Sequence, residues 1–135
     1  MNGDLVRKLG IKSGHRVFVR EECMDILAAI QPHLPPRVTV TNQPVREGTN
    51  VILMRPDEEE LETVFREMRE WITPDGAVWV VVKKKTYRQE GDVSFERAQA
   101  AALPTGLVDN KECSMGETEY ATRYVLRRAQ RPSKP

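Results

Sequence analysis

An unbroken apolar run, Ala77 to Val82, constrains the fold of this 135-residue chain more than any other feature. A strand with one face in water alternates apolar and polar residues, whereas a continuous apolar run indicates a strand covered on both faces. The run is far shorter than the ~20 residues that a membrane-spanning helix needs. We therefore expect a central strand of a parallel sheet with helices on both of its faces.

Short β-rich runs and helical patterns alternate before this strand. Strands are predicted at 15–20, 37–41 and 50–54. Between the first two, Cys23, Ile26, Leu27 and Ile30 follow the i, i+3, i+4, i+7 spacing that places residues on one face of a helix. This alternation predicts an α/β fold, a Rossmann-like three-layer sandwich with a mostly parallel sheet.

A second helix is predicted to begin at Asp57. Asp57 and Glu60 have the spacing of a capping box, and acidic residues favour the positive end of a helix dipole. An apolar stripe follows at Leu61, Val64, Phe65, Met68 and Ile72. Pro74, Asp75 and Gly76 are typical of a turn, which we expect to end this segment before the central strand.

The C-terminal third predicts one more helix and a hairpin. A polar loop runs through Gly91, Asp92 is the expected N-cap, and a helix is expected over 93–103. Segments 107–114 and 120–127 flank a turn at Gly116 and predict an antiparallel hairpin at the sheet edge. We assign 1–130 to one Rossmann-like domain and 131–135 to a flexible tail.

Composition excludes several function classes. Hydrophobic residues make up 39% and charged residues 30% of the chain, with a net charge of +1. These values are typical of a globular protein, and the near-neutral charge argues against global attraction to nucleic acid or to an acidic membrane. The N-terminus has no apolar leader, and two distant cysteines fit a reducing compartment. We expect a cytoplasmic protein with no membrane contact.

The junction between the Asp57 helix and the central strand resembles that of class I S-adenosylmethionine-dependent methyltransferases. Residues 71–80, from Trp71 through Pro74, Asp75 and Gly76 to Val80, are similar to the leucine-x-proline-glycine-glycine turn and apolar strand of those enzymes. The terminal hairpin after Gly106-Leu107-Val108 and the preceding βα alternation also match. The resemblance implies a methyltransferase fold.

A bacterial family of small proteins without an established activity, placed near these methyltransferases, is more similar still. The matching segments cover nearly the whole chain and include 8–12, 83–85, 91–92, 103–111, Cys113, 117–118 and 127–128. This resemblance implies a fold and carries no activity with it.

The cofactor loop departs from the methyltransferase pattern. Those enzymes have an acidic residue and a glycine-rich turn after the first strand, which lets the backbone approach the cofactor. Segment 19–25 contains no glycine, and segment 41–44, Thr-Asn-Gln-Pro, lacks the acidic residue expected to hold the ribose. These two absences argue against normal S-adenosylmethionine binding, so our main expectation is a protein without a cofactor.

Lys83, Lys84 and Lys85 form the sharpest local feature. They follow the central strand, and open α/β sheets bind ligands at the carboxyl ends of their strands. With Arg88 nearby, they are candidates for binding a small anionic ligand or a protein partner. A solvated loop is the simpler interpretation, since no glycine-rich phosphate cradle accompanies them.

No catalytic or metal-binding constellation is recognisable. Cys23 and Cys113 fall in apolar patterns typical of buried thiols, and His15 and His33 are isolated. Two isolated histidines do not make a metal site, and no nucleophile elbow is present. Our sequence prediction therefore names no catalytic residue and no metal, and it leans towards a protein that is not an enzyme.

Three functions remain open. The first is a non-catalytic Rossmann-like protein that binds a partner or a small anion at the strand ends. The second is a methyltransferase with atypical cofactor binding, and the third, least favoured, is a nucleic-acid-associated module using the lysines and the basic C-terminus. The hairpin, with Arg123 and Arg127 beside Val125, presents an edge that can pair with a second copy, so a homodimer is a further hypothesis.

Overall fold

Strand β4 (Ile72–Lys83) lies inside a six-stranded sheet of order β2-β1-β3-β4-β6-β5 in the computed structural model, which describes residues 2–127. The other strands are β1 (Arg16–Val19), β2 (Thr39–Thr41), β3 (Thr49–Met54), β5 (Leu107–Ser114) and β6 (Glu119–Leu126). Strands β2, β1, β3 and β4 are mutually parallel, whereas β6 is antiparallel to β4 and to β5. The predicted α/β fold with a C-terminal antiparallel hairpin is confirmed, and the sheet as a whole is mixed.

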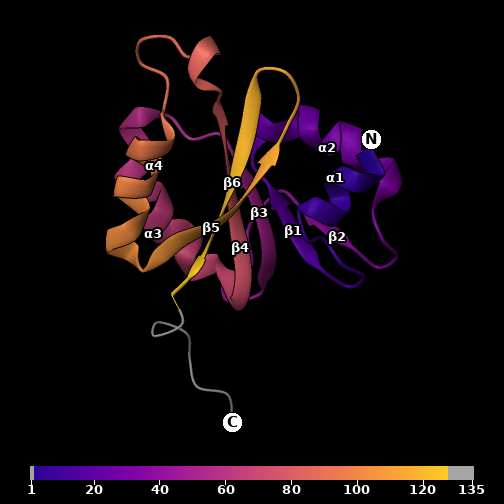
Figure 1. The fold of residues 1–135 in the computed structure, drawn as a ribbon. Helices are drawn as coiled ribbons and strands as arrows, with labels where there is room; N and C mark the ends of the chain where they lie inside the picture. Colours follow the sequence, from indigo (N-terminus) through magenta and orange to yellow (C-terminus); the bar gives the residue numbers. More distant parts are fainter. Residues whose placement is uncertain (1, 128–135) are drawn as a thin grey trace.

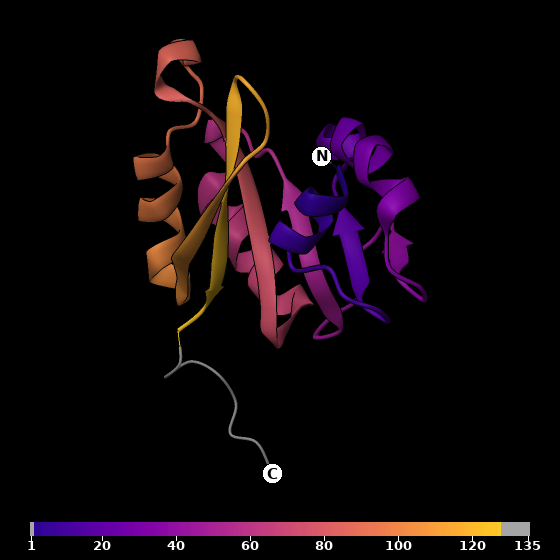
Figure 2. The same ribbon diagram turned by 45° about the vertical axis from the view of Figure 1, so that its right-hand side comes forward.

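Helices cover both faces of the sheet, so the molecule has three layers (Figure 2). On one face lie α1 (Asn2–Lys8) and α2 (Met24–Ile30), and on the other α3 (Leu61–Trp71) and α4 (Phe95–Ala102) (Figure 1). Short 3₁₀ turns adjoin them at η1 (Glu21–Cys23), η2 (Gln31–His33), η3 (Glu58–Glu60), η4 (Lys85–Tyr87) and η5 (Leu103–Thr105). No helix of the described residues is long and apolar enough to cross a bilayer.

Two apolar clusters, one on each sheet face, form the core. Along β4, Val78, Val80 and Val82 pack towards α3 and α4, while Trp79 and Val81 pack towards α1 and α2. Because β4 contributes buried side chains to both clusters, its sequence is apolar without alternation. One detail of the prediction is wrong: β4 is parallel to β3 alone and antiparallel to β6.

The helix predicted from Asp57 is present, with one correction at its end. Asp57 and Glu60 form the expected capping box ahead of α3. Leu61, Val64, Phe65 and Met68 are buried as predicted. Ile72, predicted as part of the helical stripe, is instead the first residue of β4, where it pairs with Thr49 of β3.

The expected turn at 74–76 is also corrected. Strand β4 runs through these residues, and its pairing with β3 is interrupted between Thr49 opposite Ile72 and Val51 opposite Ala77. Gly76 is required there by packing, because a Cβ would lie 2.9 Å from the Thr73 hydroxyl and 3.1 Å from the Asn50 carbonyl oxygen. The segment is therefore an irregularity within a strand.

Two helix assignments differ from the sequence prediction. Helix α1 has no counterpart in it, so the helix after β1 is the second of the chain. Helix α4 begins with Ser94 as N-cap, whose hydroxyl accepts a hydrogen bond from the Arg97 amide at 3.1 Å. Asp92, the predicted N-cap, instead accepts a bond from the Gln89 amide at 2.9 Å. Residues 131–135, predicted as a tail, lie outside the described residues.

Candidate functional site

The carboxyl ends of β1 and β3 lie side by side at the centre of the parallel part of the sheet. From β1 the chain proceeds to β2 on one side, while β3 and β4 extend the sheet on the other. This reversal makes the gap between β1 and β3 a topological switch point, which is where open α/β sheets bind ligands. The residues that follow these two strands are therefore the first to consider.

Arg55, one residue after β3, reaches across this gap. Its guanidinium donates to both carboxylate oxygens of Asp25, at 2.7 and 3.0 Å, and to both of Glu119, at 2.9 and 2.8 Å. It also donates to the Glu22 carbonyl oxygen at 2.7 Å. Arg55 thus ties the α2 side of the fold to β6, and two bidentate pairs fix its orientation.

Arg20, one residue after β1, makes a second set of ion pairs beside the first. Its guanidinium lies 3.1 Å from the Glu22 carboxylate and 2.8 Å from the Glu60 carboxylate. Glu22 in turn accepts a hydrogen bond from the Arg55 amide at 3.1 Å. We call Arg20, Glu22, Asp25, Arg55, Glu60 and Glu119 the switch-point ion cluster.

The contacts of Arg55 shift the pKa of Asp25 and of Arg55 itself. The Arg55 guanidinium lowers the pKa of the Asp25 carboxyl below its ordinary value through direct hydrogen bonds. In the same way, Asp25 and Glu119 raise the pKa of Arg55 above its ordinary value. Arg55 and Asp25 therefore stabilise each other's charged forms, and each arginine of the cluster lies within ion-pair distance of two carboxylates.

A pocket of about 270 Å³ opens beside this cluster at the ends of β3 and β4. Its charged lining contains two cations, Arg55 and Lys83, and four carboxylates, which belong to Glu22, Asp57, Asp92 and Glu119. Its apolar wall includes Val81, Val82 and Val93. The volume is slightly below the ~300–1,000 Å³ of typical ligand sites.

The structure places the predicted lysines at this edge but gives two of them protein partners. Lys83 forms an ion pair with Asp92 at 3.1 Å. The Lys84 ammonium donates to the Gly116 carbonyl oxygen at 2.7 Å in the β5–β6 turn. These two lysines therefore hold neighbouring segments together.

Lys85 and Arg88 have fewer interactions. Lys85 is exposed at the start of η4, with no ion-pair partner among residues 2–127. Arg88 lies 3.8 Å from Glu96, and its buried Nε has no hydrogen-bond partner in the described part of the chain. Of the four predicted site residues, Lys85 is the one classed as exposed, while the Arg88 side chain is 21% exposed, against 44% for Lys83.

Segment 84–91 and the β5–β6 turn project together beyond the sheet (Figure 1). The Lys84 amide donates to the Thr118 carbonyl oxygen at 2.8 Å, and the Tyr87 hydroxyl donates to Glu117 at 3.1 Å. These bonds connect η4 to the turn. The two segments therefore form one raised wall above the pocket.

The two cysteines are buried, as their apolar sequence patterns predicted. Cys23 and Cys113 are buried free thiols, and burial raises the pKa of both, that of Cys23 to about 12. Among the described residues, no group of His, Cys, Asp and Glu side chains is arranged to hold a metal ion.

Comparison with known proteins identifies solved structures that share this fold. No protein-family model and no curated protein matches the sequence. Solved structures do match: a type 11 methyltransferase assigned in Sulfolobus solfataricus has a TM-score of 0.69 at 9% identity, over 96% of this chain and 93% of that one. The chain has a methyltransferase-like fold.

Two further structures agree with this conclusion. A SAM-dependent methyltransferase from Aquifex aeolicus has a TM-score of 0.70 at 12% identity, over 91% of this chain and 88% of that one. A TehB-like SAM-dependent methyltransferase from Corynebacterium glutamicum has a TM-score of 0.58 at 9% identity, over 93% and 88%. At 9–12% identity these neighbours show the fold of this chain and carry no activity to it.

S-adenosylmethionine, the cofactor this fold implies, does not fit the switch point as the side chains lie. The backbone after β1 carries Arg20, Glu21 and Glu22 where the methyltransferase pattern has glycines. At the carboxyl end of β3, the guanidinium of Arg55 is bonded to Asp25 of α2 on one side and to Glu119 of β6 on the other. Binding there in the usual way requires the ion cluster to open.

Sequence reasoning did not identify Arg20 and Arg55. Arg20 is the last residue of the strand predicted at 15–20, and Arg55 is the first residue after the strand predicted at 50–54; this position is a detectable signal, because strand ends of α/β sheets carry functional groups. What the sequence does not give is the strand order that makes the two arginines neighbours.

Proposed function

We propose that this methyltransferase-fold protein acts by binding a small anionic ligand at the carboxyl edge of its sheet, without methyl transfer. The observation that carries the proposal is the satisfied ion cluster of Arg55 with Asp25 and Glu119, which spans the crevice where the cofactor would enter. Breaking buried or half-buried ion pairs leaves charges without partners, so displacement by a cofactor is costly.

Lys85 and Arg88 are the side chains that we propose contact the anion. Lys85 is exposed, and the partly exposed guanidinium of Arg88, whose contact with Glu96 is 3.8 Å long, supplies a second charged donor for an incoming carboxylate or phosphate oxygen. Lys83 and Lys84, held by Asp92 and by the hairpin turn, position the wall that carries them. An acidic group on a protein partner would use the same contacts.

A second candidate, a methyltransferase with atypical cofactor binding, has support of its own. The structural neighbours are methyltransferases. In addition, the pocket beside Arg55 is lined by four carboxylates, Glu22, Asp57, Asp92 and Glu119. S-adenosylmethionine carries a sulfonium and an ammonium group, and carboxylates stabilise such cations. This candidate requires Arg55 to leave its present position.

Calorimetric titration with S-adenosylmethionine and S-adenosylhomocysteine separates the two candidates. The proposal expects no saturable heat with the wild-type protein. Saturable micromolar binding by the wild type would overturn it in favour of the methyltransferase. Cofactor binding that appears only in Arg55→Ala would support the proposal, because the Arg55 guanidinium would then be what prevents binding to the wild-type protein.

The anion contact needs its own test, with citrate and inorganic phosphate as probes. We expect saturable amide chemical-shift changes at residues 84–88, lost in the double variant Lys85→Gln/Arg88→Gln. The matched control is Arg46→Gln/Arg66→Gln, which removes the same charge from exposed positions elsewhere. Unchanged spectra at 84–88, or equal losses in both variants, would overturn the assignment.

A further inference from the structure

A basic pocket lies at the opposite edge of the sheet, next to the amino ends of β1 and β3. It has a volume of about 240 Å³. Its charged lining consists of Arg7, Lys8, Lys12, Lys111 and Arg123, with the single carboxylate of Asp75 and the imidazole of His15. Five cations thus face one carboxylate in a protein whose net charge is only +1. We call this site the amino-edge basic pocket.

The sheet pairing brings two of these cations to the α1 face. Arg123 of β6 lies opposite Trp79 of β4, and Lys111 of β5 lies opposite Arg123. Residues directly opposite each other in an antiparallel pair project to the same face. Since Trp79 packs among the residues of α1 and α2, Lys111 and Arg123 project to that side as well.

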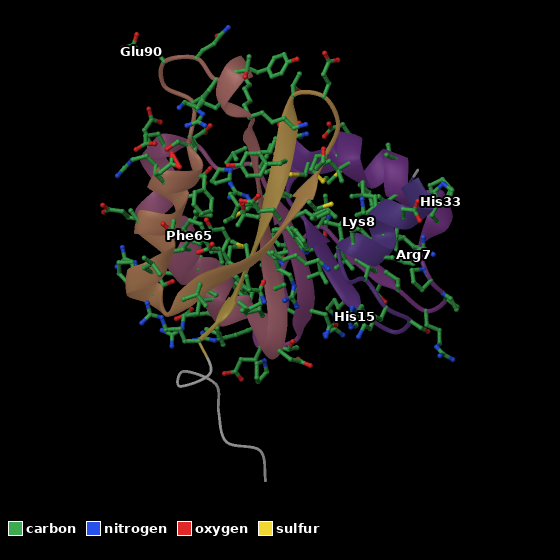
Figure 3. All side chains as sticks on the ribbon, viewed as in Figure 1. Arg7, Lys8, His15, His33, Phe65 and Glu90 are labelled. Carbon is green, nitrogen blue, oxygen red and sulfur yellow. The ribbon has the colours of Figure 1, made fainter. Side chains whose placement is uncertain are left out.

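The end of α1 supplies the next two cations. Arg7 and Lys8 form its last turn, and Figure 3 shows both on the same side of the molecule as His15. The chain after α1 is held against the sheet, because the Trp79 indole donates to the Leu9 carbonyl oxygen at 3.0 Å. Lys8 and Lys111, from elements about a hundred residues apart in sequence, both act on the thiol of Cys113 and lower its pKa against the effect of burial.

His15 adds a directed donor to the pocket. Its Nδ1 accepts a hydrogen bond from the Lys12 amide at 3.1 Å. A neutral imidazole that accepts at Nδ1 carries its proton at Nε2, so the second nitrogen is a donor. Burial and Lys12 lower the pKa of His15, which keeps this neutral form at physiological pH.

Three of the pocket's cations have no ion-pair partner in the described part of the chain. Arg7 pairs with Asp4 on the exposed side of α1. Lys8, Lys12 and Lys111 have no ion-pair partner among residues 2–127. Like charges held within a small space repel one another, and an anion in the pocket would relieve this repulsion.

We infer that the amino-edge basic pocket binds the phosphate or pyrophosphate group of a small molecule. The volume suits such a group better than a whole nucleotide, since drug-sized ligands occupy ~300 Å³ or more. Lysine and arginine side chains from α1, the loop after it, β5 and β6, together with a neutral imidazole donor, match the several acceptor oxygens of a phosphate. The inference does not depend on the proposed function, because the site lies at the other end of the strands.

The test is a titration of ¹⁵N-labelled protein with inorganic pyrophosphate, with glycerol phosphate as a phosphomonoester probe, both at constant ionic strength. We expect saturable shift changes at residues 8–15, 75–77, 111 and 123. In the double variant Lys12→Gln/Lys111→Gln the affinity should fall roughly tenfold or more. Both positions are exposed, and a well-dispersed spectrum of the variant verifies its fold.

Control variants and probes make the outcome decisive. Arg46→Gln/Arg66→Gln removes two positive charges outside the pocket and should leave the affinity unchanged. Non-saturable shifts spread over many basic residues, or equal losses in both double variants, would overturn the inference. Chemical-shift changes confined to residues 84–88 would also overturn it while supporting the proposed function.

The two probes distinguish the chemistry of the ligand. Saturation by pyrophosphate but not by glycerol phosphate would identify the pyrophosphate group as the ligand, and saturation by both would identify phosphate in general.

Discussion

The indole nitrogen of Trp79, in the middle of β4, donates a hydrogen bond of 3.0 Å to the carbonyl oxygen of Leu9. Both residues are buried, with Trp79 at 0% and Leu9 at 1% exposure. This bond attaches the segment after α1 to the central strand. It therefore supports both the packing of α1 and the floor of the amino-edge basic pocket.

Trp79→Phe should destabilise the protein by roughly 2–3 kcal/mol, because the Leu9 carbonyl loses its donor and the smaller ring leaves a void. Urea unfolding followed by circular dichroism measures this change. Trp71→Phe is the matched control, since Trp71 is only partly buried against the other face, and it should cost less. Equal losses in the two variants would contradict a special role for the Trp79–Leu9 bond.

Arg55→Ala should lower the free energy of unfolding by about 2 kcal/mol, because Asp25, Glu119 and the Glu22 carbonyl lose a charged donor together. Arg55 is 23% exposed, so solvent only partly replaces these bonds. Arg46→Ala is the control: its pair with Glu70 is exposed and 3.6 Å long, and its loss should cost less than ~0.5 kcal/mol. Denaturant midpoints that fall equally would refute the structural role of the ion cluster.

The ion pair between Asp25 and Arg55 should make the free energy of unfolding depend on pH in the acid range. The folded-state pKa of Asp25 is lowered by Arg55, so its contribution to stability is present above the ordinary value of 3.8 and is lost as the pH falls through the lower folded value. In Arg55→Ala this acid-side loss should shrink. The measurement is the urea midpoint at a series of pH values from 5 downwards, with wild type and variant compared at each pH.

His15 should make stability fall as the pH drops through its unfolded pKa of about 6.5. Burial and Lys12 lower its folded pKa, so between the two values the unfolded chain binds more protons than the native one. NMR titration of the imidazole should give a value below 6.5. His15→Gln should reduce the dependence of the urea midpoint on pH between 7.5 and 5.5, and a native pKa at or above the ordinary value would disprove this account.

The two thiols should react slowly with Ellman's reagent in the native protein at pH 8. Burial raises the pKa of Cys23 to about 12 and also raises that of Cys113, so little thiolate is present. In denaturant, both thiols should react with the reagent at the rate of free cysteine. Cys113, 5% exposed on the edge strand, should be the faster of the two, and its replacement in Cys113→Ser identifies which phase belongs to it.

The amino-acid pattern predicted the elements whose signals are local. The apolar run of β4, the capping box of Asp57 and Glu60, and the hairpin of β5 and β6 were all recognisable because each depends on neighbouring residues. Helix α1 was missed for the opposite reason. It has seven residues, too few for an isolated helix in water, and packing of Val6 against the core holds it in place.

Contacts in the folded protein also decided which residue caps α4 and where α3 ends. Ser94 rather than Asp92 caps α4, because Asp92 is engaged by the Gln89 amide and by Lys83. Ile72 has the spacing of the α3 stripe, yet pairing with Thr49 draws it into β4. In both cases two local patterns were compatible with the sequence, and contacts made in the folded protein selected one.

The sequence by itself determined the fold class, the central strand, the missing glycines after β1 and the lysines that follow β4. Only the tertiary structure decided what surrounds them. Strand order brings Arg20 next to Arg55, and the β5–β6 register brings Lys111 and Arg123 to the end of α1. Charge attraction and repulsion act through space, so both the ion cluster and the basic pocket depend on distances that the order of residues along the chain does not specify.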